Sequence, residues 1–308
     1  MLAIVNTPGG PEPVAVREIA EPAPKPTEAL VAVHAFSLNR GELRLFQVRP
    51  EGWRPGQDIA GVVVRQAADG SGPAAGTRVV ALCDWEGWAE RAAVPSHRMA
   101  PIADNVSFGA AASLPVAGLT ALRALRHGAP LLGKRMLITG AAGGVGNLAV
   151  QLAARSGARV TAVVGNAERG CILDGLGAAE IVTGIDQAQG RFELILEAAG
   201  GASLKAAIER IEHRGTVVIF GNSSGEPTEL NFRDFAEHQN ARIQGFHYFT
   251  SEPEERFGPD LALLARLVAD GSLKPRIVEH DWQELPRIGP LLRDRQIAGK
   301  AIFRIPQT

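Results

Sequence analysis

The chain has 308 residues, enough for two domains, and its 33 acidic and 32 basic side chains leave a formal net charge of −1. This balance makes nucleic acid and anionic membranes unexpected partners. The two cysteines, Cys83 and Cys171, are too few for a disulfide framework or a four-cysteine zinc site. No apolar run reaches the roughly 18 residues of a membrane-spanning helix, and no signal peptide is evident. We therefore expect a soluble cytoplasmic protein.

Residues 1–114 are predicted to be rich in β-strands. Short apolar runs are bounded there by clusters of turn-forming residues, which is the pattern of strands. The clearest runs are Ala29–Val33, Ile59–Val64 and Arg78–Leu82.

Residues 115–257 differ, because apolar strands now alternate with amphipathic helices. The predicted strands are Met136–Thr139, Val160–Val164, Glu180–Val182, Leu194–Leu196, Val217–Phe220 and Ile243–Phe246. The helices predicted between them include Val145–Ser156, Ser203–Ile211 and Phe232–Glu237. Strands joined by helical crossovers predict an α/β fold with a doubly wound parallel sheet.

The last 51 residues, 258–308, are predicted to return to the first domain. A helix is expected at Asp260–Asp270 and a strand at Ala301–Ile305. The predicted domains are therefore 1–114 with 258–308, and 115–257.

A glycine-rich turn between the strand Met136–Thr139 and the following helix is the most informative motif. Its glycines are Gly140, Gly143, Gly144 and Gly146. Strand, glycine turn and helix in this order place a pyrophosphate at a helix N-terminus, where backbone N–H groups approach it without a Cβ in the way. Because a βαβ unit follows, the motif predicts a dinucleotide site.

Five motifs in a fixed order resemble the medium-chain dehydrogenase/reductase family, and within it the zinc-free quinone oxidoreductase branch. They are Asn39–Glu42, Pro55–Val63, Gly87–Glu90, Leu114–Ala121 and Ala141–Gly146. The resemblance runs over nearly the whole chain. It implies a β-rich GroES-like catalytic domain, a Rossmann domain, and hydride transfer from a nicotinamide cofactor.

Zinc-dependent members of that family hold a catalytic zinc with Cys, His and Cys. The positions that match them by motif are Asn39, Gln57 and Val116. None is a good zinc ligand, and a valine side chain has no donor atom. The seven histidines are scattered, with no i, i+4 pair. We expect no metal.

The end of the second strand in the nucleotide domain favours NADPH over NADH. An NAD enzyme usually has an acidic residue there, which binds the ribose hydroxyls. Here Asn166 and Arg169 resemble the Ser/Thr and Lys/Arg that hold the 2′-phosphate in NADPH-dependent relatives, and a guanidinium binds phosphate through two hydrogen bonds. The negative charge of Glu168 is evidence against a phosphate site here. The alternative is that Arg169 is only a solvated helix residue.

The resemblance places further residues around the cofactor. It puts Asn39 near the nicotinamide ribose and Thr120 near the nicotinamide; a helix-interior hydroxyl bonded to its own backbone is the alternative for Thr120. Phe246 would cover the nicotinamide or belong to the core. The remaining predicted contacts are Gly140, Ala142, Gly143, Gly144, Val145, Ala199, Phe220, Gly221 and Lys300.

No strong general acid stands at a motif-matched position. The candidates for a catalytic group are Asn39, Thr120 and Tyr248, with packing or a rim position as the alternative for Tyr248. Quinones and activated alkenes form a stabilised anion on hydride transfer, and solvent can protonate it. The missing acid therefore favours conjugated acceptors over simple ketones.

The sequence thus predicts an NADPH-dependent, zinc-independent oxidoreductase that transfers hydride to a quinone or an α,β-unsaturated carbonyl. An enoyl thioester reductase of a biosynthetic pathway and a non-catalytic NADPH-binding sensor are the alternatives. A homodimer is left open.

Overall fold

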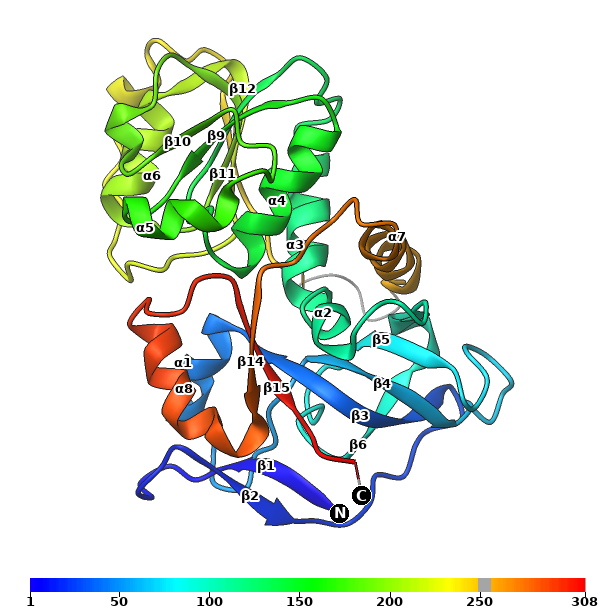
Figure 1. The fold of residues 1–308 in the computed structure, drawn as a ribbon. Helices are drawn as coiled ribbons and strands as arrows, with labels where there is room; N and C mark the ends of the chain where they lie inside the picture. Colours follow the sequence, from blue (N-terminus) through cyan, green and yellow to red (C-terminus); the bar gives the residue numbers. More distant parts are fainter. Residues whose placement is uncertain (249–255, 308) are drawn as a thin grey trace. The chain divides into compact units, whose positions relative to one another are not determined.

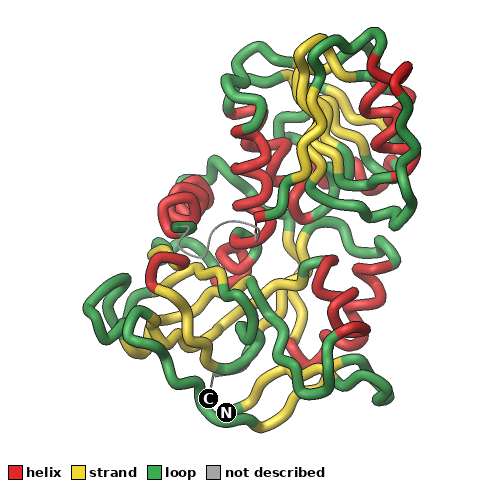
Figure 2. The backbone as a smooth tube through the Cα atoms, turned by 180° about the vertical axis from the view of Figure 1, so that it is seen from behind, coloured by secondary structure: helices red, strands yellow, loops and turns green. Residues whose placement is uncertain are grey.

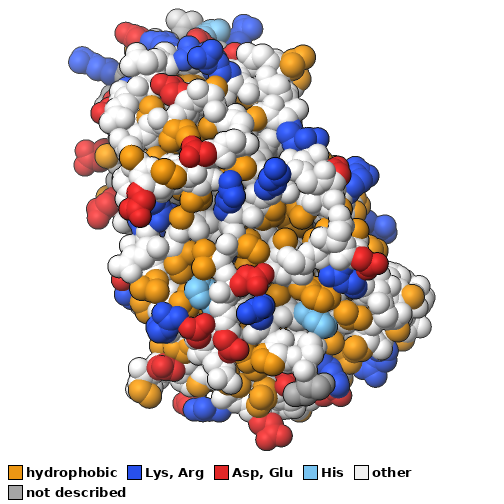
Figure 3. Space-filling view, viewed as in Figure 1, with side chains coloured by type: hydrophobic (Ala, Val, Ile, Leu, Met, Phe, Trp, Pro, Cys, Tyr) orange, Lys and Arg blue, Asp and Glu red, His pale blue; other side chains and the backbone are white. Residues whose placement is uncertain are grey.

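The computed structural model describes residues 1–248 and 256–307 (Figure 1). Contacts divide them into two units. The first holds the residues up to Leu119 and the described C-terminal residues from 256 on, and the second runs from Thr120 to Tyr248 within the described chain. No helix in the described residues is long and apolar enough to cross a membrane. Basic and acidic side chains are interspersed over the face seen in Figure 3.

The first unit is built on a seven-stranded sheet with the order β14-β15-β3-β4-β5-β7, where β6 also pairs with β3. These strands are β3 Glu28–Leu38, β4 Asp58–Arg65, β5 Arg78–Leu82, β6 Arg91–Pro95, β7 Met99–Pro101, β14 Ile277–Asp281 and β15 Lys300–Arg304. A separate antiparallel pair is formed by β1 Leu2–Asn6 and β2 Val14–Glu18.

The C-terminal strand β15 lies antiparallel to β3, with Ala301 opposite Leu38 and Arg304 opposite Ala35 (Figure 1). The chain therefore returns to the N-terminal sheet. This pairing brings the first residue of β15, Lys300, level with the end of β3.

Helices α1 Arg40–Val48, α2 Phe108–Ala112, α7 Gly258–Ala269 and α8 Leu285–Arg293 belong to this unit, and the division between the units falls inside α3 Pro115–Arg126. The sequence did not predict α1. Its N-terminus is fixed by a capping box in which Asn39 and Glu42 exchange side-chain and backbone hydrogen bonds. The apolar core lies between the sheet, α1 and α8, and includes Phe36, Phe46 and Trp88.

The second unit contains a six-stranded sheet with the order β10-β9-β8-β11-β12-β13, and all five pairings are parallel. Its strands are β8 Arg135–Ile138, β9 Arg159–Val163, β10 Glu180–Val182, β11 Phe192–Glu197, β12 Ile211–Ile219 and β13 Arg242–Gly245. The helices include α4 Gly144–Arg155, α5 Ala167–Gly170 and α6 Gly201–Glu209, and Figure 2 shows helices on both sides of the strand layer. The predicted doubly wound fold is confirmed.

One predicted helix was wrong. The segment Phe232–Glu237 forms only a short 3-10 turn, η4 Phe232–Phe235, which the Asn231 and Asp234 side chains cap. Phe232 is 90% exposed, so the segment does not bury the apolar face that stabilises an amphipathic helix in a folded protein.

Candidate functional site

The loops that follow the parallel strands β11 and β12 meet at the C-terminal edge of the second unit's sheet. The N–H of Phe220 donates to the Glu197 carbonyl at 2.9 Å, and Ser224 N–H donates to the Ala199 carbonyl at 2.8 Å. A Cβ on Gly221 would lie 3.0 Å from the Ala198 carbonyl oxygen. The predicted residues Ala199, Phe220 and Gly221 therefore share one loop cluster, at the edge where open parallel sheets bind ligands.

The glycine turn after β8 prepares the start of α4 for an anion. Gly140 takes the left-handed conformation, with φ of +61°. Gly143 is the N-cap residue of α4, and no side chain caps this helix start within the described chain. The first N–H groups of a helix have no partner inside it. Gly143, Gly144 and Val145 are partly exposed, so this helix start fits a phosphate group.

Gly146 has a different place in the turn. A Cβ there would lie 2.3 Å from the Gly140 carbonyl oxygen and 2.6 Å from the Ala141 Cα. The helix therefore packs against the preceding turn more closely than any side chain allows. Ala142, another predicted contact, is buried.

A buried carboxylate that the sequence analysis did not single out braces the neighbouring turn. Glu197, at the end of β11, is fully buried. Its Oε1 accepts hydrogen bonds from Ser203 Oγ at 2.8 Å and Ala199 N–H at 3.0 Å, and its Oε2 accepts one from Gly200 N–H at 2.9 Å. Thr139 Oγ1, which precedes the glycine turn, donates to Oε1 at 3.2 Å. The available signal was an acid that ends an apolar strand.

The two residues predicted to hold a 2′-phosphate lie together after β9. Asn166 is the N-cap of α5, and its Oδ1 accepts the Arg169 N–H at 2.8 Å. Arg169 is half-buried, and Glu168 beside it is exposed. The cap fixes the backbone of this short helix, and it therefore also fixes the position of the Arg169 Cα.

Three predicted aromatic and hydroxyl residues have different surroundings. Phe246 follows β13, donates its N–H to the Ile219 carbonyl at 2.8 Å, and contacts the His127 ring edge-on at 5.6 Å. It is partly exposed. Thr120 in α3 and Tyr248 are each 6% exposed.

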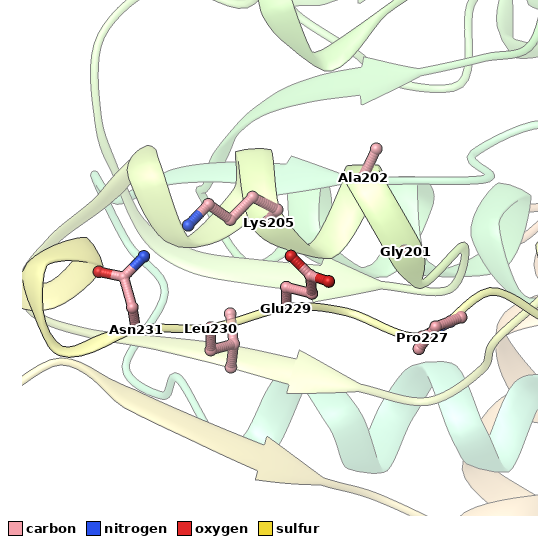
Figure 4. A pocket seen from close by; sticks show the side chains of 7 residues that line it. All are labelled: Gly201, Ala202, Lys205, Pro227, Glu229, Leu230 and Asn231. Carbon is pink, nitrogen blue, oxygen red and sulfur yellow. The ribbon is translucent and has the colours of Figure 1, made fainter.

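A pocket of about 550 Å³ lies at the start of α6 (Figure 4). It is lined by Gly201, Ala202, Lys205, Pro227, Glu229, Leu230 and Asn231. Lys205 forms an ion pair with Asp234. None of the predicted cofactor residues lines it.

In the first unit, Asp58 organises a buried polar cluster at the end of β3. Lys300 Nζ donates to Asp58 Oδ2 at 3.0 Å and also to Asn39 Oδ1, while Asn39 Nδ2 donates to the same Asp58 oxygen at 2.9 Å. Ser37 Oγ donates to Oδ2 at 2.6 Å, and the Val116 N–H donates to Oδ1 at 2.7 Å. The fold thus joins Asn39 and Lys300 over 261 positions of sequence.

Asp58 is fully buried and Lys300 is 5% exposed, whereas Asn39 is partly exposed. Asn39 therefore presents the cluster toward the surface of the unit. From sequence, Asp58 was noted only as part of a motif, although an acid at the start of the apolar run Ile59–Val64 was a usable signal.

Glu42 lies under the same cluster and was also given no role from sequence. It is 1% exposed. Its Oε2 accepts the Asn39 N–H at 2.7 Å, and its Oε1 has no hydrogen-bond partner among the described residues. Burial, helped by the nearby Asp58 charge, raises the pKa of Glu42 to about 8.

The positions that match zinc ligands do not form a cation site in the described chain. Val116 contributes a backbone donor, and an ammonium group, that of Lys300, already occupies the Asp58 carboxylate. Burial raises the pKa of the Cys83 thiol, so this thiol stays protonated. No group of three or more His, Cys, Asp or Glu side chains suited to a metal ion occurs among the described residues.

Comparisons with known proteins agree over most of the chain. Residues 25–113 match the model of the alcohol dehydrogenase GroES-like domain, and residues 144–266 match that of the zinc-binding dehydrogenases. A quinone oxidoreductase of Pongo abelii is 31% identical over 287 residues, which is 87% of this chain and 86% of the relative. The spectinabilin polyketide synthase system protein NorB of Streptomyces orinoci is 32% identical over 297 residues, 91% of this chain but 13% of that protein. The structure of Escherichia coli quinone oxidoreductase complexed with NADPH has a TM-score of 0.87 at 21% identity, over 99% of this chain and 100% of that one.

Proposed function

Because the chain belongs to the medium-chain dehydrogenase/reductase family as a quinone oxidoreductase-like member, we propose that it is an NADPH-dependent, zinc-independent reductase of quinones or α,β-unsaturated carbonyls. The observation that carries the proposal is the uncapped, partly exposed start of α4 at the C-terminal edge of a parallel sheet. Such a helix start holds a dinucleotide pyrophosphate.

NADPH is favoured over NADH by the end of β9. No acid stands at its tip to accept hydrogen bonds from the ribose hydroxyls, and the cap of α5 keeps Asn166 and Arg169 together. The Escherichia coli structure with NADPH has the same fold.

Independence from zinc is favoured by the chemistry of the polar cluster. A zinc ion needs thiolate, imidazole or carboxylate ligands. Both carboxylate oxygens of Asp58 already accept hydrogen bonds from donors of the protein. The Lys300 ammonium would also repel a second cation there.

In the proposed reaction NADPH supplies the hydride. The α4 N–H groups would hold its pyrophosphate, Arg169 its 2′-phosphate, and Asn39 with Lys300 its nicotinamide ribose. Gly140, Ala142, Gly143, Gly144, Val145, Ala199, Phe220, Gly221 and Phe246 complete the proposed cofactor contacts. Asn39, Thr120 and Tyr248 stay the candidates for groups near the reacting atoms, with solvent as the proton source.

The test is consumption of NADPH with a panel of acceptors: a small para-quinone, an aliphatic enone and a simple ketone. We expect one NADPH oxidised per quinone or enone reduced, no turnover of the ketone, and weaker activity with NADH. Tight NADPH binding without turnover of any acceptor would instead identify a non-catalytic sensor.

The similarity to the polyketide synthase protein supports a second candidate, reduction of an enoyl thioester. An enoyl-coenzyme A substrate in the same panel separates the two. A kcat/KM for the thioester well above those for quinone and enone would favour this candidate.

We further propose a cytoplasmic protein that can assemble as a homodimer. Arg242, Gln244 and Gly245 of the edge strand β13 are exposed, and an unpaired strand edge is a surface on which a second chain can add. Light scattering in solution measures the assembly directly.

A further inference from the structure

Glu42 is a buried acid with a hydrogen-bond partner on only one of its two carboxyl oxygens among the described residues. It lies in the first turn of α1, where its Oε2 accepts the Asn39 N–H at 2.7 Å. Its Oε1 is buried and has no partner among the described residues. A buried carboxylate normally fills its acceptor sites, as Asp58 and Glu197 do in this chain.

A count of charges in the cluster explains the difference. Two carboxyl groups, Asp58 and Glu42, lie near one ammonium group, Lys300, whose hydrogen bonds go to Asp58, Asn39 and the Leu38 carbonyl. An ionised Glu42 would leave one net negative charge buried, which is costly. A protonated Glu42 leaves the cluster neutral.

The charged groups on the surrounding elements do not alter this count. Helix α8 packs against the Leu43 side of α1, since a Cβ on Gly289 would lie 3.2 Å from Leu43 Cδ2. The α8 residues Arg287 and Arg293 are bound to Glu284 and Asp294 at exposed positions. On α1 itself, Arg40 and Arg44 are exposed. The charges that act on Glu42 are those of Asp58 and Lys300.

We propose that Glu42 is a positioning residue that works as a neutral acid, and that its proton keeps Lys300 and Asn39 in the arrangement that receives the cofactor. An ionised Glu42 competes with Asp58 and Asn39 for the Lys300 ammonium and draws it out of that arrangement. The cofactor part rests on the proposed function, because it needs Asn39 and Lys300 to contact NADPH. The protonation of Glu42 does not.

The experiment measures the Kd of NADPH from pH 6 to pH 9.5 for the wild type and Glu42→Gln. With a pKa of about 8, a cluster that binds only when protonated raises the Kd about tenfold between pH 7 and pH 9. In Glu42→Gln the Kd stays flat, because glutamine keeps the acceptor for the Asn39 N–H and cannot ionise. The kcat at saturating NADPH keeps the same pH profile in both proteins.

Glu51→Gln is the matched control, since Glu51 is exposed in the same unit, and it keeps the wild-type profile. The infrared carbonyl band of a protonated carboxyl group in the cofactor-free protein is the independent readout. It is present at pH 7 in the wild type and missing in Glu42→Gln.

Absence of that band from the wild type, or a Kd that rises equally in wild type and Glu42→Gln, overturns the proposal. Absence of NADPH binding at every pH overturns the proposed function and the positioning role together. The infrared band then still reports the protonation of Glu42.

Discussion

At the scale of single residues, this chain uses buried carboxyl groups in two ways. Asp58 and Glu197 are fully buried and accept donors on both oxygens, so each fixes the segments that surround it. Glu42 lacks such donors on one oxygen and is neutral at pH 7 by the charge count. The same functional group therefore braces the fold at two positions and holds a proton at a third.

Removing the charge of Asp58 should destabilise the first unit strongly. Asp58→Asn breaks the buried ion pair between Asp58 and Lys300, which costs about 3 to 5 kcal/mol of unfolding free energy. Urea denaturation measures this. The exposed Asp104, which pairs loosely with Arg78 at 3.8 Å, gives the control Asp104→Asn, with a change of at most about 0.5 kcal/mol. Similar losses in the two variants would contradict the role of Asp58.

The pH dependence of stability follows from Glu42. Its pKa in the folded chain, about 8, lies above its unfolded value of 4.5, so the folded state retains the proton longer. The contribution of this proton to the free energy of unfolding is fully present below pH 4.5. It is lost as the pH rises toward 8, by about 5 kcal/mol at most. Glu42→Gln removes this loss. The gap in unfolding free energy between variant and wild type should therefore widen from pH 5 to pH 8.5; parallel pH profiles would disprove it.

Arg169 should decide the choice of cofactor. We expect NADPH to bind at least about tenfold tighter than NADH, a difference of about 1.4 kcal/mol. Arg169→Ala should weaken NADPH far more than NADH, because only NADPH carries the 2′-phosphate. Titration of both cofactors against both proteins measures this. An equal loss for the two would remove Arg169 from the phosphate site.

At the scale of elements, the turn between β8 and α4 combines a proposed phosphate site with close packing of the helix. Gly144 begins α4 and is partly exposed, whereas a Cβ on Gly146 would meet backbone atoms of Gly140 and Ala141. The two glycines are two positions apart. Substitution of Gly144 should affect cofactor affinity, and substitution of Gly146 should affect stability.

Gly144→Val should weaken NADPH and NADH alike, because both share the pyrophosphate, and should leave the melting temperature of the cofactor-free protein nearly unchanged. Gly146→Val should lower that melting temperature, since the contact of 2.3 Å with backbone cannot be relieved by a side chain. Thermal unfolding without cofactor and two dissociation constants decide this. If Gly144→Val lost the fold and kept its affinities, the turn would not be the phosphate cradle.

At the scale of the whole molecule, each of the two units carries its own group of proposed cofactor residues. The glycine turn and the strand ends belong to the second unit, and the Asn39–Asp58–Lys300 cluster belongs to the first. Prolonged chelation should leave activity and melting temperature unchanged, because the cluster is held by an internal ammonium group. Elemental analysis provides the check: stoichiometric zinc that is lost together with activity would contradict zinc independence.

The sequence by itself determined the features that short-range pattern encodes. Alternation of apolar strands and helices predicted the parallel sheet, and the spacing of Gly140, Gly143 and Gly146 predicted a phosphate-binding turn. These signals lie within about 10 to 20 residues, the range over which periodicity and turn chemistry act. Even there the short turn Phe232–Phe235 escaped, because burial, not pattern, decides whether such a segment becomes a helix.

Only the tertiary structure decided the polar cluster and its proton. Lys300 and Asp58 are 242 positions apart, and the pairing of β15 with β3 brings them together. Their contact depends on sheet register, which no local pattern encodes. The proton on Glu42 depends on burial and on the balance of Asp58 against Lys300, and these are properties of the environment that the folded chain builds around a carboxyl group.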